Sequence, residues 1–307
     1  SSREGLNMKR NYLLIVGLTM LLFLIFIMII TPSVVNEERL VEERIQFEEG
    51  KILKAPFPPN TLNYKLGSDS DGRDLLSLIL VGTKETLLII FSITLLRYLI
   101  AVPLGLYASK KDGLSNWLVG GWNALFSSIP TLLAGIFLIN MPFIIFAENR
   151  YTLVIIIIAL LEVGRVSYII QEQGYNTLQK EFTIASKVQG AKDSQLILQH
   201  VFPYLIPTIV IHFFMDLGRV TILVAQLGIF SIFVTQQFVQ TGPLLSSMGP
   251  PFGFLENTGY NWATMLNGIK KEMHNAPWLV LVPVIAIMYI TFMFNLIGEG
   301  AKKYFLR

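Results

Sequence analysis

The sequence contains no cysteine, which excludes disulfide bonds, thiolate metal sites and a cysteine nucleophile. Histidine is nearly as scarce, and no two of His200, His212 and His274 are spaced as metal ligands on one helix. Charged residues make up only 15% of the 307 residues, whereas soluble domains carry about 25%. The net charge of +3 is small, and no basic cluster indicates nucleic acid. We therefore predict no metal site, no catalytic residue and no nucleic-acid partner for this chain.

Apolar residues are abundant instead, at 53% of the chain with a mean hydropathy of +0.57. They are concentrated in long runs, and about 20 consecutive apolar residues cross the 30 Å of hydrocarbon in a bilayer. The sequence therefore predicts an all-α membrane protein in contact with lipid. We expect six transmembrane helices, at Tyr12–Ile30, Glu85–Ser109, Trp117–Phe146, Thr152–Ile170, Pro203–Phe233 and Pro277–Gly298.

The first apolar run follows Lys9-Arg10 and could be a cleaved signal peptide. It is too long for the apolar region of a signal peptide, and Thr31-Pro32-Ser33 is a poor cleavage site, which favours a retained helix over residues 11–31. Met8 reads like a natural start, so residues 1–7 resemble a remnant of an expression tag.

The distribution of lysine and arginine predicts the orientation, because cytoplasmic loops are enriched in both. Three groups fall on one side: Lys110-Lys111, then Lys180, Lys187 and Lys192, then Lys302, Lys303 and Arg307. We expect residues 1–10, the loop 172–202 and the tail 301–307 to be cytoplasmic. We expect two parts of the chain outside: the segment 32–83, which is first acidic and then proline-rich, and the loop 236–276. Residues 84–300 are expected to form the transmembrane core of five helices, with the loops 172–202 and 236–276 included in this range. Lys270 and Lys271 oppose this orientation, but long loops obey the rule weakly.

Five ionisable residues lie within or near the apolar runs. Glu162 and Arg165 are three residues apart, as are Asp216 and Arg219, so each pair shares a helix face and can neutralise itself. Charges in spans usually face a bundle interior or a water-filled cavity. Two interpretations remain open for these pairs and Arg97: they line a polar translocation path, or they pair structurally between helices.

The segment Gly67-Ser-Asp-Ser-Asp-Gly-Arg-Asp74 precedes the second apolar run. A calcium loop is excluded because Gly72 comes too early and Leu80 stands where a glutamate is required. A helix start fits better, with Ser68 or Asp69 as the cap. The apolar residues that follow suit a helix lying along the membrane surface.

Residues Glu181–Pro207 form a polar, helix-compatible segment between two apolar runs. We expect a helix over 181–189 and a stop or a close partner contact at Gly190. Asp193 or Ser194 can cap the next helix. A chain that only needed to turn round would use fewer residues, so the segment indicates a soluble partner on the same side.

Together these motifs resemble a known family. Residues 181–207 resemble the cytoplasmic coupling loop of binding-protein-dependent ABC transporter permeases, which reads Glu-Ala-Ala, then a glycine, then Ile…Leu-Pro. Gly67–Asp74 resembles the Gly-Thr-Asp-x-x-Gly-Arg-Asp signature of the oligopeptide/dipeptide/nickel subfamily, and residues 294–300 (Phe-Asn-Leu-Ile-Gly-Glu-Gly) resemble its Asn-Leu-x-Gly-Asp-Gly ending. The resemblance covers nearly the whole chain and is closest to the C-type permease subunit.

This resemblance implies the type I ABC importer permease fold, with a cytoplasmic coupling helix, in a bacterial cytoplasmic membrane. It implies a second homologous permease as heterodimer partner, two ATPases that carry ATP and Mg, and an extracytoplasmic binding protein. It further implies that the ATPase-coupling positions are Glu181, Ala185, Ser186, Gly190 and Ala191. The chain has no Gly-x-x-x-x-Gly-Lys-Ser/Thr phosphate loop, so we predict no cofactor within it and energy from a partner.

The chain departs from the family pattern at Ile184, where a glutamate is typical, and Ser186 replaces an alanine. Peptides are the leading expected substrate, with nickel chelates or oligosaccharides as alternatives. A non-transporting membrane scaffold is a further alternative, and an intramembrane hydrolase is disfavoured because no Gly-x-Ser-x-Gly motif accompanies His212. The loop 236–276, with its glycines, prolines and aromatic residues, is expected either to dock the binding protein or to form an interfacial belt. Its aromatic residues are Phe252, Phe254, Tyr260 and Trp262.

Overall fold

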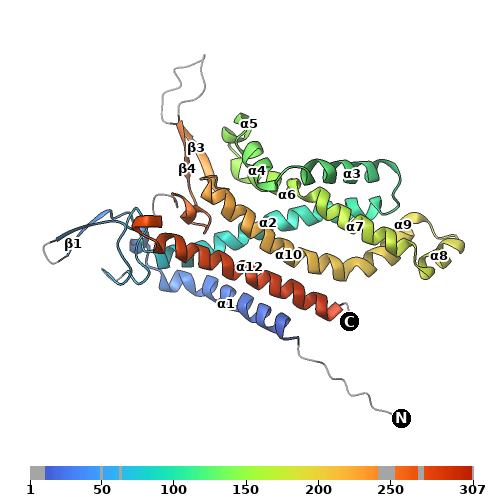
Figure 1. The fold of residues 1–307 in the computed structure, drawn as a ribbon, viewed down its shortest axis with the longest axis horizontal. Helices are drawn as coiled ribbons and strands as arrows, with labels where there is room; N and C mark the ends of the chain where they lie inside the picture. Colours follow the sequence, from blue (N-terminus) through green and yellow to red (C-terminus); the bar gives the residue numbers. More distant parts are fainter. Residues whose placement is uncertain (1–10, 49–50, 62–63, 241–252, 269–272, 306–307) are drawn as a thin grey trace, which may run out of the picture.

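The computed structural model describes residues 11–48, 51–61, 64–240, 253–268 and 273–305. It is a mostly helical, elongated molecule in which long helices run roughly along the long axis (Figure 1). The helices are α1 (Tyr12–Val34), α2 (Leu75–Ala108), α3 (Gly113–Ser127), α4 (Thr131–Ile139), α5 (Pro142–Ile145), α6 (Arg150–Leu161), α7 (Val163–Leu178), α8 (Glu181–Val188), α9 (Asp193–Leu196), α10 (Phe202–Ile229) and α12 (Trp278–Phe305). Short 3-10 turns cover Glu37–Leu40 and Thr264–Leu266, and a π-helical turn at Ile197–Val201 joins α9 to α10.

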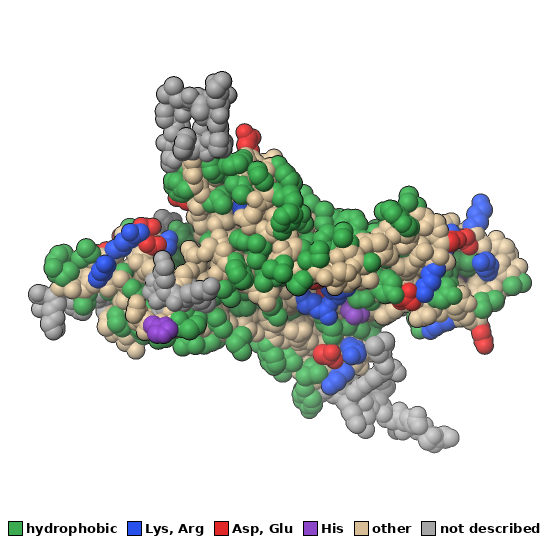
Figure 2. Space-filling view, turned by 45° about the horizontal axis from the view of Figure 1, so that its top comes forward, with side chains coloured by type: hydrophobic (Ala, Val, Ile, Leu, Met, Phe, Trp, Pro, Cys, Tyr) green, Lys and Arg blue, Asp and Glu red, His purple; other side chains and the backbone are tan. Residues whose placement is uncertain are grey.

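Within the described residues, five helices are long and apolar enough to cross a membrane, or six if one bent pair counts as a single span. The prediction of a helical membrane protein is therefore confirmed. Charged side chains gather at the two ends of the long axis, with smaller groups near the middle and at the lower edge of this view, and most of the remaining surface is hydrophobic or neutral (Figure 2).

The main core lies where α2, α6, α10 and α12 meet. β-branched residues supply much of it, among them Ile89 and Ile93 from α2 and Ile158 from α6, all with almost no exposed surface. Helix α1 packs along α12 at the periphery, and most of its side chains stay exposed. Glycines permit this contact: a Cβ on Gly300 would lie 2.6 Å from the backbone nitrogen of Leu14. Gly300, in the glycine-containing motif near the end of the chain, thus allows α1 and α12 to pack closely.

Helix α2 differs from its prediction. Its N-cap is Asp74, whose carboxylate accepts the backbone N–H of Ser77 at 3.0 Å, and not Ser68 or Asp69. From there one continuous helix of 34 residues runs to Ala108, so residues 75–83 are its first turns and not a separate surface helix.

Asp69 organises the loop before α2, because its carboxylate accepts the N–H groups of Asp71 and Arg73 and pairs with the Arg73 guanidinium at 2.8 Å. Burial raises the pKa of Asp69, although Arg73 pulls it down.

The third predicted span, Trp117–Phe146, is not one straight helix. Helices α3 and α4 are bent by 94° at a short break, and α5 follows separately. The break ends at Pro130, and a residue before proline avoids the helical conformation. The hydropathy stays high across the break, which is why the apolar pattern alone predicted a single helix.

Two antiparallel hairpins add the described strands, β1 (Ile45–Glu48) with β2 (Lys51–Lys54) and β3 (Gln236–Gln240) with β4 (Gly253–Asn257). They lie toward the end of the molecule opposite α8 (Figure 1). The predicted outer loop contains β3 and β4, but Trp262 is wrongly assigned to an exposed surface. Its indole N–H donates to the carbonyl of Ile79 at 2.9 Å, and the residue is 2% exposed. The loop's Gly242-Pro243, Gly249-Pro250-Pro251 and Phe252 lie outside the described residues.

Candidate functional site

The candidate site begins with a break between two helices. Helix α6 ends at Leu161 and α7 begins at Val163, and Glu162 between them has a non-helical backbone with φ −113° and ψ 9°. The last carbonyls of a helix lack intrahelical donors. Arg97 of α2 supplies them, donating to the carbonyl oxygens of Ile158 at 3.2 Å and Ala159 at 3.4 Å. The indole N–H of Trp122 donates to the next carbonyl, that of Leu160, at 3.0 Å.

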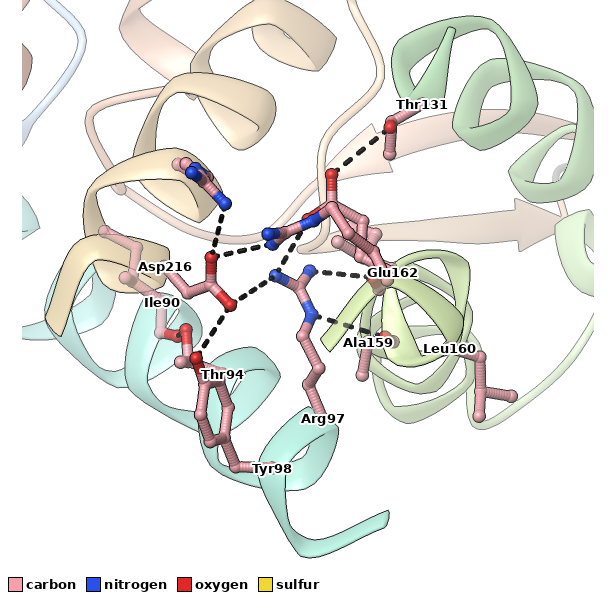
Figure 3. Close-up of polar contacts among 12 residues, drawn as sticks. Ile90, Thr94, Arg97, Tyr98, Thr131, Ala159, Leu160, Glu162 and Asp216 are labelled. Atoms are coloured by element: carbon pink, nitrogen blue, oxygen red, sulfur yellow. Dashed lines mark hydrogen bonds and ion pairs between the residues drawn. The ribbon is translucent and has the colours of Figure 1, made fainter. Parts of the chain in front are cut away.

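The five ionisable residues singled out from the sequence form one connected network (Figure 3). Glu162 contacts Arg165 at 2.8 Å and Arg97 at 3.3 Å. One oxygen of Asp216, Oδ1, accepts from Arg165 at 2.7 Å and from Arg219 at 3.2 Å. The other oxygen, Oδ2, lies 4.0 Å from Arg97. The predicted pairs therefore form as expected, and contacts between helices join them into one group.

The network is graded in its exposure to solvent. The side chains of Arg97 and Asp216 are 1% and 2% exposed, while those of Arg165 and Arg219 are 31% and 52% exposed. Burying a charge without a partner costs several kcal/mol, so the inner pair depends on its contacts. The outer arginines form the edge of the network that faces the surface.

Two partners of the network were missed from the sequence. The hydroxyl of Tyr98 donates to Asp216 Oδ2 at 3.0 Å, and the hydroxyl of Thr131, in the first turn of α4, donates to Glu162 at 3.2 Å. Tyr98 directly follows Arg97, but it carries no charge, and no spacing in the sequence indicates that its hydroxyl contacts Asp216. Thr131 directly follows Pro130, and only recognition of the break there would have placed it near a charge.

A cavity of about 390 Å³ opens beside the network, at the bend between α3 and α4. Its lining includes Glu162 and Arg165 together with the hydroxyl-bearing residues Ser127, Ser128 and Thr131. Pockets of about 300–1,000 Å³ suit small ligands. Broken helices that turn polar groups into such a space are typical of sites within transporters.

The predicted coupling segment forms helix α8, which projects at the end of the molecule away from the hairpins (Figure 1). It starts with Glu181 in its first turn and stops where Gly190 takes a φ of +91°, a conformation that favours glycine. The N–H groups of Gly190 and Ala191 bond back to the carbonyls of Lys187 and Ser186. The helix stop expected at Gly190 is confirmed.

The next helix, α9, begins at Asp193 with Lys192 as its N-cap, so neither Asp193 nor Ser194 is the cap residue. The Gln195 side chain accepts the N–H of Lys192 at 3.0 Å. Asp193 instead pairs with Lys110 after α2, at 2.8 Å. Nearby, Lys111 contacts Glu172 at 2.9 Å, and this hydrogen bond raises the pKa of Lys111.

Helix α8 keeps an apolar strip exposed. Ile184 and Val188, one turn apart, are 47% and 83% exposed, whereas Thr183 is buried and donates to the carbonyl of Thr177 at 2.6 Å. Ala185 is exposed beside this strip, and Ser186 is partly covered. The coupling roles of Glu181, Ala185, Ser186, Gly190 and Ala191 stay predictions.

The fold and these sites define a polytopic membrane protein of the transport class. Residues 101–305 match the model of the family described as binding-protein-dependent transport system inner membrane component. The chain belongs to this family, and is a permease subunit with the type I ABC importer permease fold.

Individual relatives agree with this family. The chain is 23% identical to the dipeptide transport system permease protein DppC of Alkalihalophilus pseudofirmus, over 96% of this chain and 86% of that protein. It is 26% identical to the peptide transport system permease protein SapC of Escherichia coli, over 79% of this chain and 73% of that protein. It is 23% identical to the oligopeptide transport system permease protein OppC of Bacillus subtilis, over 97% and 86%.

Proposed function

We propose that this chain is one half of the membrane channel of an ATP-driven importer of peptides. The relatives' names, which specify dipeptide, peptide and oligopeptide transport, support the substrate class. A second homologous permease completes the path, and two cytoplasmic ABC ATPases bind ATP and Mg and supply the energy. An extracytoplasmic binding protein delivers the peptide.

The observation that carries the proposal is the connection between α8 and the ionic network. After Gly190 the chain continues through α9, the π-helical turn and α10 as one apolar helical stretch, Asp193–Ile229. Asp216 and Arg219 lie on this stretch. A displacement of α8 by an ATPase would therefore be transmitted along a helix to the charges beside the cavity, as rigid elements with two arrangements allow.

The same geometry supports a proposal for the orientation. The side-chain amide of Asn11, at the start of α1, donates to the carbonyl of Gly300 at 2.6 Å, so the two ends of the described chain lie together. They lie toward the α8 end of the molecule, away from both hairpins (Figure 1). We infer that both termini and α8 are cytoplasmic and that the hairpins are extracytoplasmic.

Reconstitution in proteoliposomes with the cognate permease, ATPases and binding protein tests the function. We expect ATP-dependent uptake of tri-alanine and stimulation of ATP hydrolysis by the peptide-loaded binding protein. The double variant Ile184→Asp, Val188→Asp should reduce both at least tenfold, because it places charge on the exposed apolar strip. The variant Gln189→Asp, which adds one charge at the end of the same helix outside the strip, should keep most of the activity.

A complex that assembles but shows neither uptake nor peptide-stimulated hydrolysis would support the scaffold alternative. Uptake that survives the double variant unchanged would show that α8 does not receive the ATPase. Uptake of a nickel chelate or an oligosaccharide in place of tri-alanine would change the substrate and keep the mechanism.

A further inference from the structure

The network beside the cavity carries one positive charge in excess. Three arginines, Arg97, Arg165 and Arg219, share the two carboxylates of Glu162 and Asp216. Both carboxylates are already used: each accepts hydrogen bonds on both of its oxygens. An arginine cannot lose its proton in a protein, so the excess charge has to be met by water or by an anion.

The unmet donors lie on the exposed edge of the network. Arg97 uses Nε, Nη1 and Nη2 within the protein. Among the described residues, Arg165 Nη1 and the Nε and Nη2 atoms of Arg219 have no acceptor. Because Arg165 and Arg219 both donate to Asp216 Oδ1, their guanidinium groups lie side by side and can present donors to one further acceptor.

The position of this edge argues against contact with lipid. Arg219 lies ten residues before the end of α10 at Ile229, which at a rise of 1.5 Å per residue is about 15 Å inside the helix. Charges at such depth face a protein interior or a water-filled path. The cavity that Glu162 and Arg165 line is large enough for the end of a small peptide. Its three hydroxyl groups donate within the protein, so their oxygens can accept from the backbone N–H groups of that peptide.

We propose that Arg219, with Arg165, forms a carboxylate-binding subsite in the translocation path. The ligand is the C-terminal carboxylate of the transported peptide, and the hydroxyl-lined cavity at the bend between α3 and α4 accommodates the residues before it. This rests on the proposed peptide import and deepens it. An Arg–carboxylate pair with two parallel hydrogen bonds is the preferred geometry for such recognition. An acidic peptide side chain offers the same chemistry, so the test separates the two sources.

Uptake of tri-alanine as the free acid is compared with its C-terminal amide in the reconstituted complex. The wild-type complex should prefer the free acid at least tenfold. Arg219→Gln should bring the acid-to-amide ratio close to one by lowering uptake of the acid much more than uptake of the amide. Arg219→Lys should keep most of the preference. Gln226→Ala, on the same exposed face of α10 two turns further along, should leave the ratio at its wild-type value.

In this comparison of the acid with the amide, three outcomes would overturn the proposal. The first is a wild-type ratio near one. The second is an Arg219→Gln variant that keeps the wild-type ratio, because another component then selects the carboxylate. The third is an equal loss of both peptides in that variant, which would mean that Arg219 pairs with a partner subunit. If the amide of Ala-Ala-Asp is taken up as well as free tri-alanine, and through Arg219, the ligand is a side-chain carboxylate and the C-terminal assignment fails.

A readout without transport separates this proposal from peptide import itself. Phenylglyoxal modifies accessible arginines, and mass spectrometry follows the segment that contains Arg219. Free tri-alanine should slow modification of Arg219 severalfold, and its amide should not. Protection without uptake would reject import and keep the subsite, whereas uptake without protection would reject the subsite and keep import.

Discussion

At the scale of single residues, Asp216 is the acceptor on which the ionic network depends most. Its two oxygens accept from Tyr98, Arg165 and Arg219 and face Arg97, and its side chain is 2% exposed. Asp216→Ala would leave three arginines around the single carboxylate of Glu162. Since removing one partner of a buried ion pair costs about 3–5 kcal/mol, we expect a loss of that size in the free energy of unfolding, measured by denaturant titration of the purified complex in detergent.

The matched control is Arg219→Gln, which removes the outer partner of the same carboxylate. That arginine is half exposed, and exposed ion pairs contribute only about 0–1 kcal/mol. A loss for Asp216→Ala no greater than for Arg219→Gln would show that Asp216 is not the structural centre of the network. The contrast also separates stability from ligand recognition, because the carboxylate subsite depends on Arg219 while the fold does not.

At the scale of elements, Arg150 connects α6 to the base of the β3–β4 hairpin. It is 1% exposed, and Nη1 donates to the carbonyls of Phe233 at 3.1 Å and Gln236 at 2.9 Å, while Nη2 donates to the Gln236 side chain. Arg150→Met would remove all three hydrogen bonds, while the Phe233 carbonyl and Gln236 Oε1 keep backbone N–H donors at 3.3 and 3.2 Å, so the expected cost is about 1–3 kcal/mol in total. We expect faster amide hydrogen exchange in β3 and β4, with α2 unchanged. Arg44→Met, at an exposed arginine, is the control; equal exchange in both variants would contradict the role of Arg150.

The elements also show what the sequence could predict. Hydropathy located the long helices because every apolar run of membrane length is visible in one sequence. Spacing likewise predicted that Glu162 pairs with Arg165 and Asp216 with Arg219. The joining of these pairs depends on which helices pack together, which a single sequence without covariation does not contain. The contacts of Arg150 could not be predicted for the same reason, because its acceptors lie more than eighty residues away.

Two other errors have a local cause. Pro130 indicates a break in the helix, but the sequence is apolar on both sides of it. The hydropathy therefore led to the prediction of a single helix over Trp117–Phe146. Trp262 was assigned to an outer aromatic surface because aromatic residues are common at membrane interfaces. It is buried because Thr86 accepts its backbone N–H at 2.9 Å and because its indole reaches back to α2.

At the scale of the whole molecule, the two ends should lie on opposite sides of the membrane. Because the sequence contains no cysteine, a thiol reagent labels only a cysteine that is introduced, and its labelling shows on which side of the membrane that residue lies. Phe47 in β1 and Val188 in α8 are 77% and 83% exposed, and they lie at opposite ends of the long axis (Figure 1). In intact cells, or in spheroplasts if an outer membrane is present, an impermeant maleimide should label Phe47→Cys. It should label Val188→Cys only after permeabilisation, since α8 is expected among the lysine-rich cytoplasmic segments.

Labelling of Val188→Cys without permeabilisation, with Phe47→Cys protected, would show that the orientation is the reverse of the proposed one. It would also remove α8 from the reach of a cytoplasmic ATPase, so this measurement tests the coupling proposal as directly as it tests the topology.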